Sequence, residues 1–316
     1  MNSKPTVLVS ENKTVFQTWF LDEIWQQYFN VEIIDPNKNY DVRSTVVVSD
    51  WVDFSNQQNV NERTLAQSGI RHVIDKCWDS WDSVFDNSAD FTLRPIDFMW
   101  INESLWYTSL GYHKLELTSN PSRDFLLLMH LKKPWRTKLY NRLSPVLSAN
   151  VYSYVGDDVV LQNAKDIPYN TENWQRYTDP TWYTDTRFSV VSEANVVAPD
   201  PLDLINVTEK TLKTCAFKHP CIIWGHAGTL AWQRRQGFET FEHCIDEGYD
   251  SVLDEEVRLD GVIEQIHLCI SDKTIFTDPL TKQKLEHNYN HFYNQEIIMK
   301  LMHEQIIDPL LEFINA

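Results

Sequence analysis

The chain has 316 residues, which suffice for two domains of ordinary size or for one large α/β unit, and we expect two domains. Its 45 acidic and 28 basic residues give a net charge of -17, so the long-range field repels polyanions and disfavours binding to nucleic acid or to an anionic membrane. Only eight residues are glycine, and neither G-x-G-x-x-G nor G-x-x-x-x-G-K-S/T occurs, which disfavours a Rossmann dinucleotide loop and a P-loop.

The first residues and the cysteines predict where the protein resides. The opening MNSKPTVLVSENK has neither the basic flank nor the apolar core of a signal peptide, and no apolar run approaches the roughly 18 residues of a membrane span. Five cysteines form an odd set without C-x-x-C spacing, as expected for reduced thiols and not for a disulfide or zinc framework. We therefore expect a cytoplasmic protein without an integral membrane segment.

Short β-rich runs dominate the first part of the chain. They are TVLVS (6–10), VEIID (31–35), STVVVSD (44–50) and RHVID (71–75). Amphipathic helix patterns lie between the first two runs and near residues 57–68. This alternation of strand, helix and strand predicts a parallel sheet. No element is assigned from about residue 77 to residue 120, and TSNPSRD (118–124) is the expected linker.

A second α/β unit follows this linker. DFLLLMH (124–130) predicts a strand and PWRTKLYNRLSP (134–145) a helix, with a proline as the boundary signal at each end. RFSVVSE (187–193) predicts a further strand, which leads through a loop rich in Pro and Asp to the helix TEKTLKTCAFK (208–218) and the strand PCIIWG (220–225). Ligands of parallel α/β units lie beyond the carboxyl ends of the strands, at helix N-termini. The loop after Glu193 and the start of the helix at Thr208 are therefore the expected ligand positions.

Basic residues are concentrated in two places of this acidic chain. The segment from Phe125 to Gly156 contains no acidic residue, and within it five basic residues are clustered: Lys132, Lys133, Arg136, Lys138 and Arg142. A second group begins in the next expected helix and consists of Lys210, Lys213 and Lys218. Lys210 stands in the first helical turn, where a cation is unfavourable to the helix dipole, so its position favours a role in binding an anion. The alternative for the first group is a solvated basic helix face.

Four sequence elements in this order resemble a known enzyme family. PWRTKLYNRL, FSVVSEAN, VTEK and PCIIWG look like the C-terminal donor-binding domain of the α-1,3-fucosyltransferases, over roughly residues 121–250. The resemblance implies a GT-B fold, in which two Rossmann-like domains face a cleft, and inverting glycosyl transfer from a nucleotide sugar. GDP-fucose is the donor of that family. A UDP-sugar is the alternative here, because Ala194 separates Glu193 from Asn195 where the family has adjacent Glu and Asn.

The resemblance also assigns roles to individual residues. Arg136 and Lys210 would hold the diphosphate, and Glu209 would accept hydrogen bonds from the ribose. Glu193 would lie on the donor-sugar side of the cleft, as a second catalytic residue beside the general base. The other donor-binding residues expected from the resemblance are Lys138, Asn195 and Thr208. The nucleotide sugar is a substrate, so no cofactor is expected.

An inverting mechanism needs a general base to take the acceptor proton. In the family this carboxylate lies in the N-terminal domain near the end of a strand. Asp79, Asp50 and Glu11 compete for the role here, and we prefer Asp79. No D-x-D triplet, the usual carboxylate device of metal-dependent sugar transferases, occurs in the chain. Lysine and arginine are therefore expected to neutralise the leaving diphosphate without a metal ion.

The predicted organisation has three parts. Residues 1–120 would form the acceptor-side Rossmann-like domain and residues 121–290 the nucleotide-sugar-binding domain. Residues 291–316 would form a C-terminal helix with one apolar face, interrupted near Pro309. The acceptor would be a glycan or another molecule. The alternative to an enzyme is a catalytically silent α/β module that binds a nucleotide sugar or a glycan.

Overall fold

The computed structural model of the chain divides into two compact units. It describes residues 4–9, 23–35, 37–50, 69–75, 91–93, 97–118, 120–130, 132–154, 178–197, 205 and 207–316. The first unit combines Met1–Phe98 with Glu296–Ala316, and the second is Met99–Gln295. This division differs from the expected one, because the boundary lies at Phe98 instead of near residue 120 and the C-terminal helices join the first unit.

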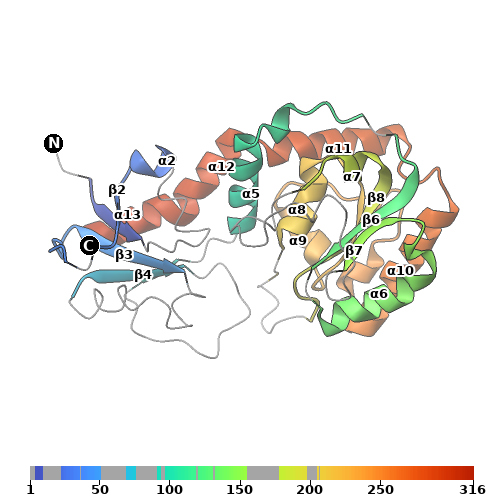
Figure 1. The fold of residues 1–316 in the computed structure, drawn as a ribbon, viewed down its shortest axis with the longest axis horizontal. Coiled ribbons are helices and arrows are strands. Elements are labelled where there is room, and N and C mark those ends of the chain that lie inside the picture. Colours follow the sequence, from blue (N-terminus) through green and yellow to red (C-terminus); the bar gives the residue numbers. More distant parts are fainter. Residues whose placement is uncertain are drawn as a thin grey trace. The chain divides into compact units, whose positions relative to one another are not determined.

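The first unit contains a parallel sheet of five strands in the order β2-β1-β3-β4-β5 (Figure 1). Its strands are β1 (Thr6–Val9), β2 (Asn30–Ile33), β3 (Thr45–Asp50), β4 (Arg71–Asp75) and β5 (Phe91–Leu93). The short helix α2 (Glu23–Gln26) precedes β2. The four strands predicted from the sequence are thus confirmed, whereas β5 falls in a segment to which no element was assigned. The helix expected near residues 57–68 lies outside the described residues.

The C-terminal helical segment packs on this first unit because one of its faces is apolar. It consists of α12 (Gln295–Met302), a π-helical turn (His303–Ile307) and α13 (Asp308–Asn315). The buried residues Ile298, Met302, Ile306, Leu310 and Ile314 follow one another at intervals of four. The π turn ends two residues before Pro309, whose ring has no N–H for an ordinary helical hydrogen bond. The predicted helix and its interruption near Pro309 are therefore confirmed.

Strand β4 anchors the end of this segment. The Arg71 guanidinium donates hydrogen bonds to the backbone carbonyls of Phe313 (2.8 Å) and Ile314 (2.6 Å). The rings of Phe91 and Phe313 stack with their centroids 4.8 Å apart. A cation on the last carbonyls of a helix is favoured by the helix dipole. These contacts explain why residues 296–316 belong to the first unit, which sequence separation alone does not indicate.

The second unit contains a parallel sheet of four strands in the order β7-β6-β8-β9. Its strands are β6 (Arg123–Met129), β7 (Val151–Tyr154), β8 (Thr186–Ser192) and β9 (Cys221–Trp224). The chain passes from β6 outward to β7, and later from β8 outward to β9 in the opposite direction. Because such crossovers are right-handed, α6 and α8 cover opposite faces of the sheet. The direction of winding changes between β6 and β8.

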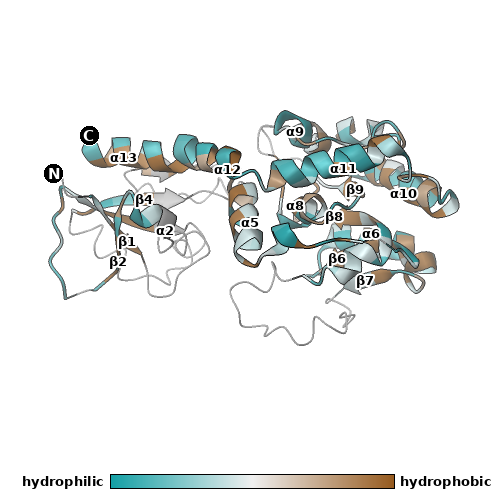
Figure 2. Ribbon diagram, turned by 90° about the horizontal axis from the view of Figure 1, so that it is seen from above, coloured by the Kyte–Doolittle hydropathy of each residue, from teal (hydrophilic) through white to brown (hydrophobic). Residues whose placement is uncertain are grey.

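Helices enclose this sheet. They are α5 (Phe98–Ser109), α6 (Pro134–Leu147), α7 (Thr181–Thr184), α8 (Glu209–Ala216), α9 (Thr229–Arg235), α10 (Glu255–Ser271) and α11 (Pro279–Phe292), with 3₁₀ turns at Tyr112–Lys114 and Gly248–Ser251. Helix α10 contacts α6 and β9, whereas α8 contacts α11 and β8. Figure 2 shows a largely hydrophilic side of α11, as expected of a helix that covers a core. No described helix is long and apolar enough to cross a membrane.

Helix α6 differs from its prediction at one end. It begins at Pro134 as expected, but it continues through Pro145 to Leu147. Proline has no N–H to donate to the carbonyl four residues earlier, which is that of Asn141. The Ser144 hydroxyl donates to this carbonyl instead, at 2.9 Å. The last turn therefore tolerates a proline that the sequence analysis took as the helix boundary.

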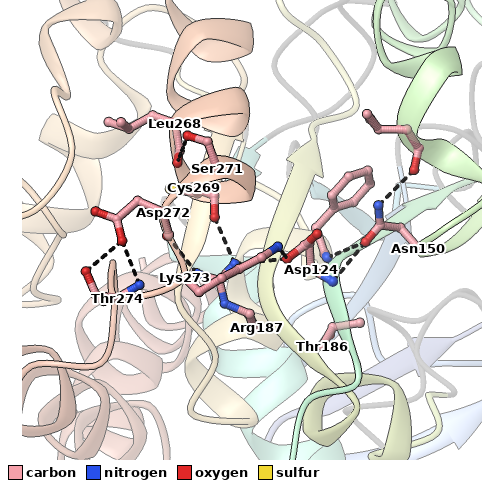
Figure 3. Close-up of polar contacts among 12 residues, drawn as sticks. Asp124, Asn150, Thr186, Arg187, Leu268, Cys269, Ser271, Asp272, Lys273 and Thr274 are labelled. Carbon is pink, nitrogen blue, oxygen red and sulfur yellow. Dashed lines mark hydrogen bonds and ion pairs between the residues drawn. The ribbon is translucent and has the colours of Figure 1, made fainter.

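Charged side chains join the amino ends of β6 and β8 to the end of α10 (Figure 3). Arg187 Nη1 donates to Asp124 Oδ1 at 2.9 Å and to the carbonyl of Cys269 at 2.8 Å. Its Nη2 donates to the carbonyl of Asp272 at 3.1 Å, and Lys273 also pairs with Asp124. Arg187 thus satisfies carbonyls that the end of a helix leaves without partners.

Asn150 connects the end of α6 to the start of β6. Its Oδ1 accepts the N–H groups of Asp124 and Phe125, both at 2.9 Å, and its Nδ2 donates to the carbonyl of Val146 at 2.8 Å. Figure 3 shows the two bonds to β6. Asn150 is buried. If its side chain were removed, the two N–H groups and the carbonyl that it contacts would be left without a hydrogen bond.

We predict that Asn150→Ala lowers the free energy of unfolding by about 2–3 kcal/mol, since a buried donor left without its acceptor costs about 1–3 kcal/mol. Urea denaturation measures the difference. Asn315→Ala is the control, because its amide makes a single exposed hydrogen bond to the Leu311 carbonyl. Equal stabilities of the two variants would contradict the role given to Asn150.

Candidate functional site

The change of winding direction places two helix starts beside the carboxyl ends of β6 and β8. In doubly wound sheets this position is where ligands bind. The side chain of Lys133, at the start of α6, crosses between the two strands and donates to the carbonyl of Ala194, just after β8, at 2.9 Å. The elements on both sides of the switch point are therefore joined by a direct contact.

Glu193 follows β8 directly and is fully buried. Its Oε1 accepts the N–H of Thr208 at 3.1 Å and the hydroxyl of Thr211 at 2.5 Å. Its Oε2 accepts the hydroxyl of Thr208 and the N–H of Ala194, the latter at 3.2 Å. All four donors come from the chain itself. Glu193 therefore fastens the start of α8 to the end of β8, and its expected place beside a donor sugar and its catalytic role stay predictions.

Thr208 and Lys210 form the first turn of α8. Thr208 is the N-cap, and its hydroxyl oxygen accepts the N–H of Lys210 at 3.4 Å. The ammonium group of Lys210 lies 2.5 Å from Glu209 Oε1 and 3.3 Å from the Thr208 hydroxyl. Burial favours the neutral acid, but the charges of Lys210 and Lys213 outweigh it and lower the pKa of Glu209 to about 2. Glu209 is thus ionised at neutral pH.

The cations of the two helices act on one another. Burial and the charges of Arg136 and Lys210 lower the pKa of both His130 and Lys133. Burial also lowers the pKa of Arg136, while the charges of Glu209 and Glu193 act in the opposite direction. These mutual effects show that groups at the end of β6 and in α6 lie near Lys210 of α8, which is more than seventy residues later in the sequence.

The described charges at this position are mostly positive. Among the described residues of the cluster, four cations (Lys133, Arg136, Lys210 and Lys213) stand against two carboxylates (Glu193 and Glu209). The excess is unusual in a chain with a net charge of -17. A local excess of fixed cations beside two helix N-termini suits an anion.

Other predicted site residues lie elsewhere. Lys138 pairs with Glu255 (2.6 Å) and with Glu256 at the start of α10, so it faces away from the cluster. Asn195 is half-buried in the turn after β8. The preferred general base, Asp79, lies outside the described residues, as does Glu11. Asp50 ends β3, and the position of its side chain is not described.

Arg258, a residue that the sequence analysis did not select, holds the turns that follow β8 and β9. Arg258, buried in α10, donates to the carbonyls of Gly225 (3.1 Å) and Leu253 (3.0 Å), and also to that of Val196 after β8. A Cβ atom on Gly225 would lie 3.3 Å from Glu193 Cγ, so glycine allows β9 to approach the carboxylate closely. A lone arginine within the apolar repeat of α10 is the only sequence signal for this role.

Within the described part of the chain, three buried polar side chains at the ends of β8 and β9 have no hydrogen-bond partner: Ser192, Trp224 and His226. Ser192 and Trp224 are register partners on adjacent strands. Burial and the charge of Arg258 lower the pKa of His226 to about 4, so its imidazole is neutral. Buried polar groups are normally satisfied, and exceptions are found at functional sites. No group of three His, Cys, Asp or Glu residues that could hold a metal ion occurs among the described residues.

We predict that Glu193→Gln destabilises the protein by about 1–3 kcal/mol, the cost of a buried donor without an acceptor. Each carboxylate oxygen accepts one backbone N–H, from Thr208 or from Ala194. Either orientation of the amide therefore sets an NH₂ group against a backbone donor. Thermal melts compare this variant with Glu264→Gln, an exposed position on α10. A wild-type melting temperature for Glu193→Gln would refute the fastening role.

No family model matches the chain, and no curated protein matches it. The function of the protein is therefore inferred from the arrangement of its own residues. Lys133, Arg136 and Lys210 converge beside the carboxyl ends of two parallel strands. Doubly wound sheets bind their ligands at this position, and the cations found there suit an anion.

Proposed function

We propose that this protein is a glycosyltransferase of GT-B architecture. It transfers a sugar with inversion from a nucleotide diphosphate donor, GDP-fucose or a UDP-sugar, to a glycan or another acceptor, and it does so in the cytoplasm. The observation that carries the proposal is the convergence of Lys133, Arg136 and Lys210 at the switch point of the second sheet. The resemblance of the surrounding segments to the α-1,3-fucosyltransferases adds the reaction class.

The two sheets support the GT-B architecture. The strand order of the first, β2-β1-β3-β4-β5, and that of the second, β7-β6-β8-β9, both change direction beside their first strand. Each is a doubly wound order of the kind that binds nucleotides. A chain with two such units has the parts that a GT-B enzyme needs, one for the acceptor and one for the donor.

The cations of the second unit suit a leaving diphosphate. A helix N-terminus contributes about 0.3–1 kcal/mol to anion binding, whereas a charge-assisted hydrogen bond from Lys or Arg contributes about 1.5–3 kcal/mol. The side chains of Arg136, Lys133 and Lys210 therefore dominate. They neutralise the charge that grows on the diphosphate as the glycosidic bond breaks, so in this proposal no metal ion is required.

The carboxylates have different duties in the proposed reaction. Glu209 holds the ammonium group of Lys210 at 2.5 Å and would accept hydrogen bonds from the ribose of the donor. Glu193 acts through Thr208, which it fixes at the start of α8. Asp79 remains the proposed general base, with Asp50 and Glu11 as alternatives.

We predict that Arg136→Gln weakens binding of GDP or UDP about tenfold or more, because one charge-assisted hydrogen bond is lost. Lys133→Gln is expected to act in the same direction with less effect on stability, since Lys133 is only half-buried. Isothermal titration calorimetry measures both. Arg142→Gln is the control on the same helix, because Arg142 pairs with the exposed Asp260. Wild-type affinity in folded Arg136→Gln and Lys133→Gln would refute the proposed site.

We predict that Lys210→Ala lowers kcat as well as donor affinity. The negative charge on the leaving diphosphate, which Lys210 would neutralise, grows in the transition state. Release of free nucleotide from GDP-fucose and UDP-sugars measures turnover. Lys282→Ala, exposed on α11, is the control for loss of a surface lysine. A wild-type kcat for Lys210→Ala would end this assignment. Donor binding without any turnover would instead identify the chain as a nucleotide-sugar-binding module.

A further inference from the structure

A cleft lies at the opposite edge of the second sheet, where β6 and β8 begin. Its volume is ≈330 Å³, and it is lined by Thr118, Asn120, Thr181, Trp182, Thr184 and Asp185. Strands β6 and β8 each have seven residues. At about 3.3 Å per residue, the cleft is separated from the cationic site by about 20 Å.

Backbone hydrogen bonds hold the two segments that form this cleft. The N–H of Asn120 donates to the carbonyl of Thr184, and the N–H of Ser122 donates to the carbonyl of Asp185, both at 3.0 Å. The hydroxyl of Ser122 also donates to Asp185 Oδ1 at 2.7 Å. The backbone on both sides of the cleft is therefore fixed. Less conformational entropy of the protein is lost when a ligand binds there.

Three side chains of the lining have hydrogen-bonding capacity to spare. Within the described part of the chain, the hydroxyl of Thr118, the amide of Asn120 and the indole N–H of Trp182 form no hydrogen bond. Asp185 adds a carboxylate oxygen, Oδ2, which lies 3.7 Å from Arg123 Nε. That distance is too long for a hydrogen bond. Together these groups offer donors and acceptors beside an aromatic ring.

The lining excludes several ligand classes. None of its described residues is Lys or Arg, and Asp185 carries a negative charge, so the cleft does not favour an anion. Five of the six residues are polar, so it does not favour an apolar ligand either. One carboxylate is too few for a cation site. A neutral ligand that is rich in hydroxyl groups and has an apolar face satisfies the remaining conditions.

We infer that this cleft binds a neutral carbohydrate. Its volume is near the lower end of the range for small-molecule sites, about 300–1,000 Å³, which suits one or two sugar rings. The indole of Trp182 contacts the C–H face of the ring. Asn120, Thr118 and Asp185 exchange hydrogen bonds with its hydroxyl groups. The site is distinct from the donor site and does not rest on the proposed function.

The test uses the full chain labelled with ¹⁵N and a panel of methyl glycosides of glucose, galactose, mannose, fucose and N-acetylglucosamine. The Trp182 indole resonance is assigned as the one that disappears in Trp182→Phe. We expect at least one glycoside to shift this resonance in a saturable manner. Failure of the whole panel to shift it would overturn the inference.

Variants show whether the sugar occupies this cleft. Asn120→Ala removes a side-chain amide that makes no hydrogen bond within the described part of the chain and keeps the backbone N–H, so it leaves the fold intact. We expect this variant to weaken sugar binding about fivefold. Trp182→Ala is expected to weaken it more. Asn315→Ala, at the end of α13, is the matched control. Unchanged affinity in Asn120→Ala and Trp182→Ala would overturn the inference.

A competition experiment separates the two sites. The sugar is expected to bind Arg136→Gln as tightly as the wild type, and GDP or UDP is not expected to displace it. Displacement by either nucleotide would place the sugar in the cationic site and overturn the inference. Loss of nucleotide binding in Arg136→Gln with retained sugar binding would support it, and so would sugar binding by a chain that binds no nucleotide.

Discussion

The hydrogen bonds of one buried carboxylate, that of Glu193, determine the geometry of the candidate site. A buried charge is tolerated only when its oxygens are fully hydrogen-bonded, and here four donors surround it. Two of these donors belong to Thr208, the N-cap of α8, so the carboxylate sets where that helix begins. The position of Lys210 follows, because it lies two residues further along the same turn. The close approach of Gly225 completes the arrangement from the side of β9.

The acidic residues of the site keep its cations in place. Glu209 holds Lys210, and the lowered pKa of Glu209, about 2, means that its carboxylate is ionised throughout the physiological pH range. Arg136 is buried, and burial disfavours its charged form. The negative charges of Glu209 and Glu193 favour the charged form and oppose this cost. The site therefore retains net positive charge while each cation is oriented. Such fixed charges need no reorganisation when an anion binds.

Local patterns in the sequence predicted much of this fold, and distant contacts account for what they missed. Short apolar strand patterns and the helix pattern from Thr208 identified β6, β8, α8 and β9, because these signals are contained in a few neighbouring residues. The order of these elements indicated that α8 starts beside the end of β8, whereas the shared site of Arg136, Glu209 and Lys210 was expected from the resemblance to a known family and stays a prediction. Lys138 faces away from the cationic cluster because it pairs with Glu255 in α10, more than a hundred residues later. No local sequence pattern predicts this contact. The return of residues 296–316 to the first unit depends likewise on partners such as Arg71.

The contrast between the two edges of the second sheet follows from its winding. Crossover helices start at the carboxyl ends of parallel strands, so their positive dipole ends gather there, and the basic residues of α6 and α8 add to that field. Helix C-termini reach the other edge. There Arg187 neutralises the carbonyls at the end of α10, and Asp124 in turn balances Arg187. Beside these internal pairs, the amino edge keeps hydroxyl, amide and indole groups and the carboxylate of Asp185. One sheet thus presents a cluster of cations at one end and a polar cleft without lysine or arginine in its described lining at the other.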